Sequence, residues 1–133
     1  MGQQLLELVR ASKRVYIIGN GGSYANATHI ANDLLASGIR AYTLDAATLT
    51  AFANDHGYAS VFARWLEVLG EEGDLVIALS GSGTSKNILH AIIAAERIGM
   101  AVHLQTNYLR GRDMQESEED QVRLGHDLMR ALR

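Results

Sequence analysis

The sequence predicts an α/β fold, a three-layer sandwich in which a parallel sheet of about four strands lies between two layers of helices. Two observations predict this fold. Segments with strand and helix patterns alternate along the chain, and the segments 14–20 and 74–80 are continuous apolar runs, typical of strands buried on both faces. A chain of 133 residues has the usual size of one domain, so we expect residues 1–133 to form a single domain.

The elements follow from local patterns of apolar residues. Strands are expected at 14–20, 40–45, 74–80 and 101–106. Helices are expected at 5–12, 23–37, 48–54, 58–69, 85–98 and 116–132, with a polar linker at 108–115. Gly38 and Gly99 are placed to end two of these helices. Strands separated by helices form a parallel sheet with right-handed crossovers, and such sheets bind ligands at the carboxyl ends of their strands.

The composition excludes several classes of protein. The net charge of −3 argues against binding nucleic acid through phosphate neutralisation, and the 47% of hydrophobic residues rules out disorder. The absence of cysteine excludes a disulfide framework, a cysteine-ligated zinc site and a thiol nucleophile. No apolar run reaches membrane-spanning length, and the N-terminus lacks the pattern of a signal peptide. We therefore expect a soluble cytoplasmic protein with no membrane or direct nucleic-acid partner.

Two turns rich in glycine and serine follow buried strands and lead directly into helices. The first reads GNGGS at 19–23 and the second reads SGSGTS at 80–85. Glycines let the backbone approach a ligand, and the first turn of a helix offers free N–H groups and a positive dipole end to an anion. Hydroxyl groups add neutral donors. The pair of turns therefore predicts a phosphate cradle.

Three other kinds of site or structure use similar turns. A P-loop ends in Gly-Lys-Ser/Thr, which neither turn contains. A dinucleotide fingerprint needs a third glycine where Tyr24 stands, so we expect no nucleotide cofactor. The turns could also merely cap helices, because Ser23 and Ser85 are good N-cap residues. Two such turns on successive central strands weigh against that simpler interpretation.

A third motif is the segment 53–83, which reads ANDHGYASVFARWLEVLGEEGDLVIALSGSG. The three motifs together resemble the sugar isomerase (SIS) domain family and, within it, the phosphoheptose isomerases. The resemblance covers residues 15–107. It implies a flavodoxin-like sandwich, a homotetramer with active sites between subunits, and aldose–ketose isomerisation of sedoheptulose 7-phosphate. This family has a further helix and a fifth strand before its last helix. Here only the short polar linker stands in that place, so we expect a sheet without the usual fifth strand.

The resemblance also implies which residues form the site. The residues that match substrate-binding positions are Asn20, Gly21, Gly22, Ser23, Asn54, Asp55, Ser80, Ser82 and Ser85, and Thr84 is placed to substitute for a family threonine that falls on Gly81. The residues that match the metal or acid–base set are His29, Asp33, Glu118 and His126. Asp33 stands where the family has Glu, and Glu118 where it has Gln. A divalent metal such as zinc is the implied cofactor.

The chemistry of isomerisation suits these residue types. His29 and Asp33 are four residues apart and share a helix face. The reaction needs a base, an acid for the oxygen and stabilisation of a negative oxygen, so His29, Asp33 and His126 are the candidate catalytic residues. The simpler interpretation is a solvated helix pair and a surface histidine. We expect the four residues of the metal set to approach one another near the cradle.

Two other functions stay open at this point. The shortened C-terminal half favours a non-catalytic module of the same fold, which binds a sugar phosphate or a protein such as a replication initiator. A degenerate subunit that works only with a partner is a third interpretation. The trimmed chain and its alanine-rich helices also predict apolar faces that a homo-oligomer would bury.

Overall fold

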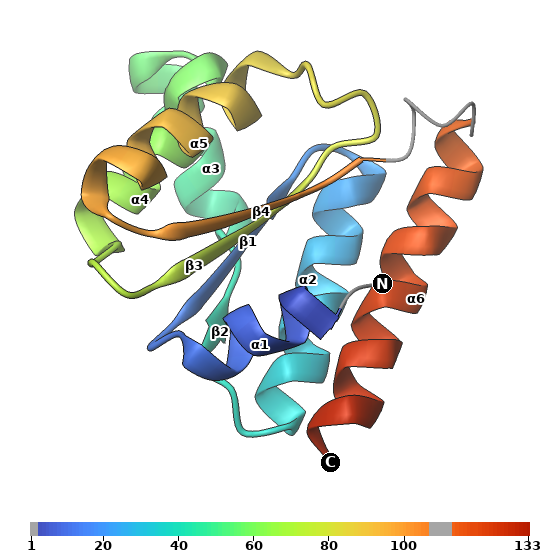
Figure 1. Cartoon of the computed structure of the whole chain (residues 1–133). Helices are drawn as coiled ribbons and strands as arrows, with labels where there is room; N and C mark the ends of the chain where they lie inside the picture. The colour runs from blue at the N-terminus through green and yellow to red at the C-terminus, as the bar shows by residue number, and fades with distance from the viewer. Residues whose placement is uncertain (1–2, 107–112) are drawn as a thin grey trace.

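The structure, a computed structural model, describes residues 3–106 and 113–133. In these residues four parallel strands form one sheet in the order β2-β1-β3-β4 (Figure 1). The strands are β1 (Val15–Gly19), β2 (Ala41–Tyr42), β3 (Leu75–Leu79) and β4 (Ala101–Gln105). Every residue of β1 and β3 is buried, as their continuous apolar runs predicted. The predicted α/β fold with a parallel four-stranded sheet is confirmed.

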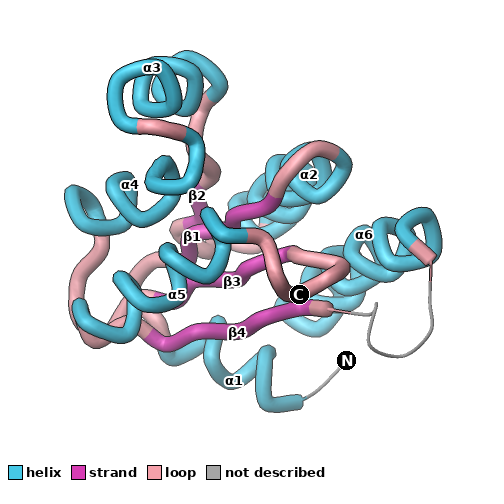
Figure 2. The backbone as a smooth tube through the Cα atoms, turned by 90° about the horizontal axis from the view of Figure 1, so that it is seen from above, coloured by secondary structure: helices cyan, strands magenta, loops and turns pink. Residues whose placement is uncertain are grey.

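Helices cover both faces of the sheet (Figure 2). They are α1 (Gln3–Ala11), α2 (Gly22–Ala36), α3 (Ala46–His56), the 3₁₀ turn η1 (Tyr58–Ser60), α4 (Val61–Leu69), α5 (Lys86–Ile98) and α6 (Met114–Leu132). One core lies between the sheet and α1, α2 and α6, and the other lies between the sheet and α3, α4 and α5. Successive β1 residues alternate between the two cores: Ile17 enters the first and Ile18 the second. In the described ranges, no helix is long and apolar enough to span a membrane.

The second strand is shorter than the predicted 40–45, because the residues after Tyr42 are used in other contacts. The Leu44 carbonyl accepts a hydrogen bond of 2.6 Å from the Tyr24 hydroxyl. Asp45 caps α3 by accepting from the Thr48 N–H at 3.1 Å, so α3 begins at Ala46 and not at Thr48. The strand therefore ends at Tyr42, and the predicted end at residue 45 is wrong because Asp45 caps α3 instead.

The last helix also begins earlier than the predicted 116. Asp113 accepts a hydrogen bond from the Glu116 N–H at 2.8 Å and caps α6, which therefore starts at Met114. Most of the linker predicted at 108–115 falls on residues 107–112, which lie outside the described part of the chain.

Helix α6 packs beside α2, and the two helices run in the same direction (Figure 1). Leu124 and Leu128 of α6 are buried in the first core. The helices approach closely at Gly125, where an added Cβ would lie 2.7 Å from Ile30 Cγ1. Only glycine allows this approach, which brings the side chains next to Gly125 against α2.

Candidate functional site

The two glycine- and serine-rich turns line one cavity of about 80 Å³. They meet because β1 and β3 are neighbours in the sheet and both turns leave the carboxyl ends of these strands. The lining residues are Asn20, Ser23, Leu79, Ser80, Gly81, Ser82, Ser85 and Met114. The expected convergence of the turns is confirmed, and binding of a phosphate there stays a prediction.

The serine hydroxyls of this cavity keep a proton to donate. Ser80 Oγ accepts from the Gly83 N–H at 3.0 Å, and Ser82 Oγ accepts from the Thr84 N–H at 3.2 Å. Ser85 is the N-cap residue of α5, but its side chain makes no capping bond. A hydroxyl that accepts a hydrogen bond still has its own O–H to donate. The cavity therefore offers neutral donors to an anion, next to the N-terminus of α5.

A polar contact between α2 and α6 lies beside the cavity. Gln121 of α6 is buried, and its Nε2 donates to Ser23 Oγ at 3.0 Å. Asn26 Nδ2 donates to Gln121 Oε1 and to the Glu118 carbonyl, each at 2.9 Å. Sequence analysis missed Gln121, because a glutamine in a polar helix gives no signal until the register of α6 against α2 is known.

Three side chains with metal-ligating or acid–base chemistry meet where α2 and α6 are in contact. His29 and Asp33 come from α2, and His126 comes from α6. The two histidine Nε2 atoms are 3.0 Å apart. Asp33 Oδ2 lies 3.5 Å from His29 Nε2 and 3.9 Å from His126 Nε2. We call these three residues the triad.

The geometry of the triad fits a divalent ion. Ligand atoms bound tetrahedrally at about 2.0–2.1 Å from zinc lie about 3.3 Å from one another, which is close to the observed separations. Asp33 Oδ2 is buried without a hydrogen-bond partner, and the Asp33 side chain is only 13% exposed. A buried carboxylate oxygen in this state is expensive unless a cation or donor pairs with it. Two imidazoles and one carboxylate also form a common donor set for zinc, with one position left open for substrate.

Glu118 does not join the triad, contrary to the expected set of four. In the described residues, the ligand atoms that gather within 4.8 Å belong to His29, Asp33 and His126. The Glu118 carboxylate instead lies over Gly22, where an added Cβ would overlap it. The reason is helix geometry: Glu118 precedes His126 by eight residues, about 12 Å along the axis, so the parallel helices bring it to the start of α2.

Other residues expected at the site lie outside the cavity wall. Asn54 and Asp55 are exposed at the end of α3, where Asn54 Nδ2 donates to Asp55 Oδ1 at 3.2 Å. Gly21 is the N-cap of α2 with a positive φ of 56°, a conformation that favours glycine, and it does not line the cavity. Thr84 bonds to Ser82 at the rim of the turn. The structure therefore gathers only part of the expected substrate-binding set around one cavity.

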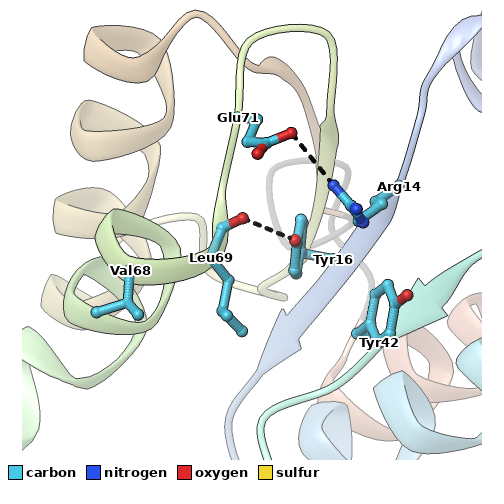
Figure 3. A pocket seen from close by; sticks show the side chains of 6 residues that line it. All are labelled: Arg14, Tyr16, Tyr42, Val68, Leu69 and Glu71. Carbon is cyan, nitrogen blue, oxygen red and sulfur yellow. Dashed lines mark hydrogen bonds and ion pairs between the residues drawn. The ribbon is translucent and has the colours of Figure 1, made fainter.

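A second cavity, of about 390 Å³, lies at the opposite end of β1 (Figure 3). Tyr16 and Tyr42 stack there with ring centroids 5.6 Å apart, and Arg14 pairs with Glu71 at 3.3 Å. The Tyr16 hydroxyl donates to the Leu69 carbonyl at 3.1 Å, and burial raises the pKa of Tyr16. None of the site residues expected from the sequence lines this cavity.

Comparisons with known proteins show what the chain is similar to in sequence and in structure. The SIS domain family matches residues 2–103. The chain is 42% identical over 109 residues to a phosphoheptose isomerase of Campylobacter concisus, covering 75% of this chain and 57% of the relative. It is 43% identical over 114 residues to a phosphoheptose isomerase of Sulfurimonas denitrificans, covering 80% of this chain and 56% of the relative. The structure of phosphoheptose isomerase GmhA from Neisseria gonorrhoeae superposes with a TM-score of 0.85 at 26% identity, covering 96% of this chain and 80% of that one.

Proposed function

Because the chain belongs to the SIS domain family, we propose that it is a sugar-phosphate isomerase, which interconverts the aldose and ketose forms of a sugar such as sedoheptulose 7-phosphate. The single observation that carries the proposal is the meeting of His29, Asp33 and His126. The names of its relatives support the reaction, although the chain spans less than two thirds of their length.

Helix α2 connects the cavity to the triad and suits a long substrate. Ser23 lines the cavity, and His29 follows it by six residues, about 9 Å along the helix axis. A phosphate held by the turns would leave the far end of an extended sugar chain near the triad. This separation favours a sugar phosphate with a long carbon chain over a triose phosphate.

The triad provides the groups that the reaction requires. Isomerisation removes a proton from the carbon next to the carbonyl, passes through an enediol and returns the proton to the neighbouring carbon. We assign removal of the proton to the Asp33 carboxylate, and proton exchange with the substrate oxygens to the imidazoles of His29 and His126, because imidazole both donates and accepts near neutrality. A divalent ion such as zinc, held by these three residues through the two Nε2 atoms and Asp33 Oδ2, would supply a Lewis acid for the carbonyl. With the ion bound, the uncoordinated atoms of the same side chains, the imidazole Nδ1 atoms and Asp33 Oδ1, would carry the proton transfers.

The proposal includes an assembly and a setting. A homotetramer, as the resemblance implies, would act in the cytoplasm on its phosphorylated sugar, without contact to membrane or nucleic acid, as the composition and charge predict. Exposed apolar side chains support self-association: Val68 on α4 is 77% exposed and Ile93 on α5 is 53% exposed.

The test is to incubate the protein with sedoheptulose 7-phosphate, with and without added zinc, and to follow the aldose product by NMR. We expect product to form, at a rate that rises with zinc loading. An Asp33→Asn variant is the matched control, because it keeps the shape of the side chain and removes the base and the charge. Binding of the sugar phosphate without turnover in any metal state would reject the isomerase in favour of a non-catalytic binding module.

A further inference from the structure

A pair of side-chain amides joins the first turn of the cavity to the start of α5. Asn20, after β1, donates from Nδ2 to Asn87 Oδ1 at 2.9 Å. Asn87 donates back from Nδ2 to Asn20 Oδ1 at 2.8 Å, and it lies in the first turn of α5 with 3% of its surface exposed. The hydroxyl of Tyr58, from η1, donates to the same Asn20 oxygen at 2.6 Å. Three separate elements therefore meet at one amide.

The hydrogen-bonding capacity of Asn20 leaves one group free. A side-chain amide has two N–H groups and an oxygen with two lone pairs. Asn87 and Tyr58 use both lone pairs of the Asn20 oxygen, and Asn87 uses one N–H. In the described residues the second N–H of Asn20 has no partner, and Asn20 lines the cavity.

We propose that Asn87 and Tyr58 are positioning residues, which hold the Asn20 amide so that its remaining N–H donates to an anionic oxygen of the phosphorylated sugar. This inference rests on the proposed function, because it names residues that serve the same cavity. Only a side chain with both a donor and an acceptor can pair with an amide in this reciprocal way. Aspartate at position 87 would set one of its oxygens against the Asn20 oxygen and add a negative charge beside the bound anion.

Loss of the hydrogen bonds that hold Asn20 should change KM and not kcat. A phosphate group remote from the reacting carbons is bound equally in the ground state and the transition state, so weaker binding raises KM and leaves kcat nearly unchanged. We expect Asn87→Asp to raise KM about ten- to a hundredfold, the range for a hydrogen bond to a charged group. Tyr58→Phe removes one neutral hydrogen bond and should raise KM about two- to tenfold.

Tyr42→Phe is the matched control for Tyr58→Phe. Both tyrosines are exposed to a similar degree, 41% for Tyr42 and 48% for Tyr58, and Tyr42 lies on β2, outside the cavity wall. We expect this control to keep the parent KM and kcat. Because Tyr58 is exposed, its variant should fold even where a variant of the buried Asn87 does not.

A second measurement needs no turnover. The side-chain amide signals of Asn20 are followed by ¹⁵N NMR while inorganic phosphate is added to the protein. We expect one Asn20 N–H to shift with phosphate in the parent, less in Tyr58→Phe, and not at all in Asn87→Asp. A phosphate response without isomerase activity would reject the proposed function and leave the positioning role standing.

Two results would overturn the inference. One is an Asn20 amide that does not respond to phosphate in the parent protein. The other is a set of folded Asn87→Asp and Tyr58→Phe proteins with the KM and the phosphate response of the parent.

Discussion

Asp33 on α2 and His126 on α6 lie close together, although they are far apart in the sequence. Neither residue lines the cavity of the two turns, so a substitution in the triad can be tested separately from phosphate binding. His126 belongs to the triad and does not line the cavity of the two turns. A variant at His126 should therefore act on the chemical step and leave anion binding intact.

We predict that His126→Ala lowers kcat about a hundredfold or more, the range for losing an acid–base group. Phosphate affinity, measured by NMR titration, should stay at the parent value. Zinc retained on equilibrium dialysis should fall, because the triad loses one of its three ligand atoms. Equal losses of turnover and of phosphate binding would point to a structural role for His126.

Tyr16 and Tyr24 make the free energy of unfolding depend on pH. Burial raises the pKa of Tyr16, and burial followed by the charge of Asp45 raises the pKa of Tyr24. A raised pKa in the folded state means that the unfolded chain loses the phenolic proton first. The resulting stability is complete below about pH 10, the ordinary pKa of tyrosine, and is lost as the pH rises further.

We predict that the free energy of unfolding in urea falls steeply above about pH 10 in the parent. In the double variant Tyr16→Phe, Tyr24→Phe it should fall less steeply. The variant should be less stable at pH 7 by about 1–3 kcal/mol, since it loses the hydrogen bonds to the Leu69 and Leu44 carbonyls. Identical alkaline slopes in the two proteins would contradict the assignment.

At the scale of elements, the site depends on how closely α6 approaches α2. Gly125 faces Ile30 where α6 and α2 lie close together, next to His126. Any side chain there must push the helices apart or force Ile30 to move. The position of one glycine thus sets the distance between the parts of the triad.

We predict that Gly125→Ala lowers the free energy of unfolding by about 1–3 kcal/mol, the usual cost of overpacking, despite the better helix propensity of alanine. Zinc affinity should fall with it, because His126 moves away from His29 and Asp33. Arg123→Ala is the control on the same helix: Arg123 is exposed, and its loss should change stability by no more than about 0.5 kcal/mol. An unchanged or more stable Gly125→Ala protein would refute the close contact.

Much of the fold could be predicted from the sequence, because its signals are local. Buried runs such as Leu75–Leu79 and the turns after them mark strands and ligand-binding ends without knowledge of packing. The parts of the site that were missed depend on long-range register. Glu118 lies over Gly22, and Tyr58 reaches Asn20, only because helices separated in sequence dock in one particular way. A family pattern supplies residue types for such positions but not their contacts in a shortened chain.

At the scale of the whole molecule, the exposed apolar side chains predict self-association. Val68 lies on α4 and Ile93 on α5, two of the helices that cover one face of the sheet. Large exposed apolar patches on a protein surface mark sites of association.

We predict that light scattering with size-exclusion chromatography reports a homo-oligomer at micromolar concentration, with a tetramer as the expected mass. The double variant Val68→Asp, Ile93→Asp should shift the mass toward the monomer, because it places charges in the proposed contact. Leu35→Asp, an equally exposed change on α2, tests whether any added charge has this effect. A stable monomeric parent would rule the assembly out.

The triad also has a consequence for the connectivity of the chain. His29 and His126 are separated by 97 positions, so an ion bound by both would act as a reversible cross-link that closes a very long loop. In the chain-entropy description, fixing a loop of about 100 residues removes disorder from the unfolded chain worth roughly 4–5 kcal/mol. The proposed ion would then stabilise the packing of α6 on the rest of the domain. A chelator that removed the ion would destabilise this helix and abolish isomerase activity together.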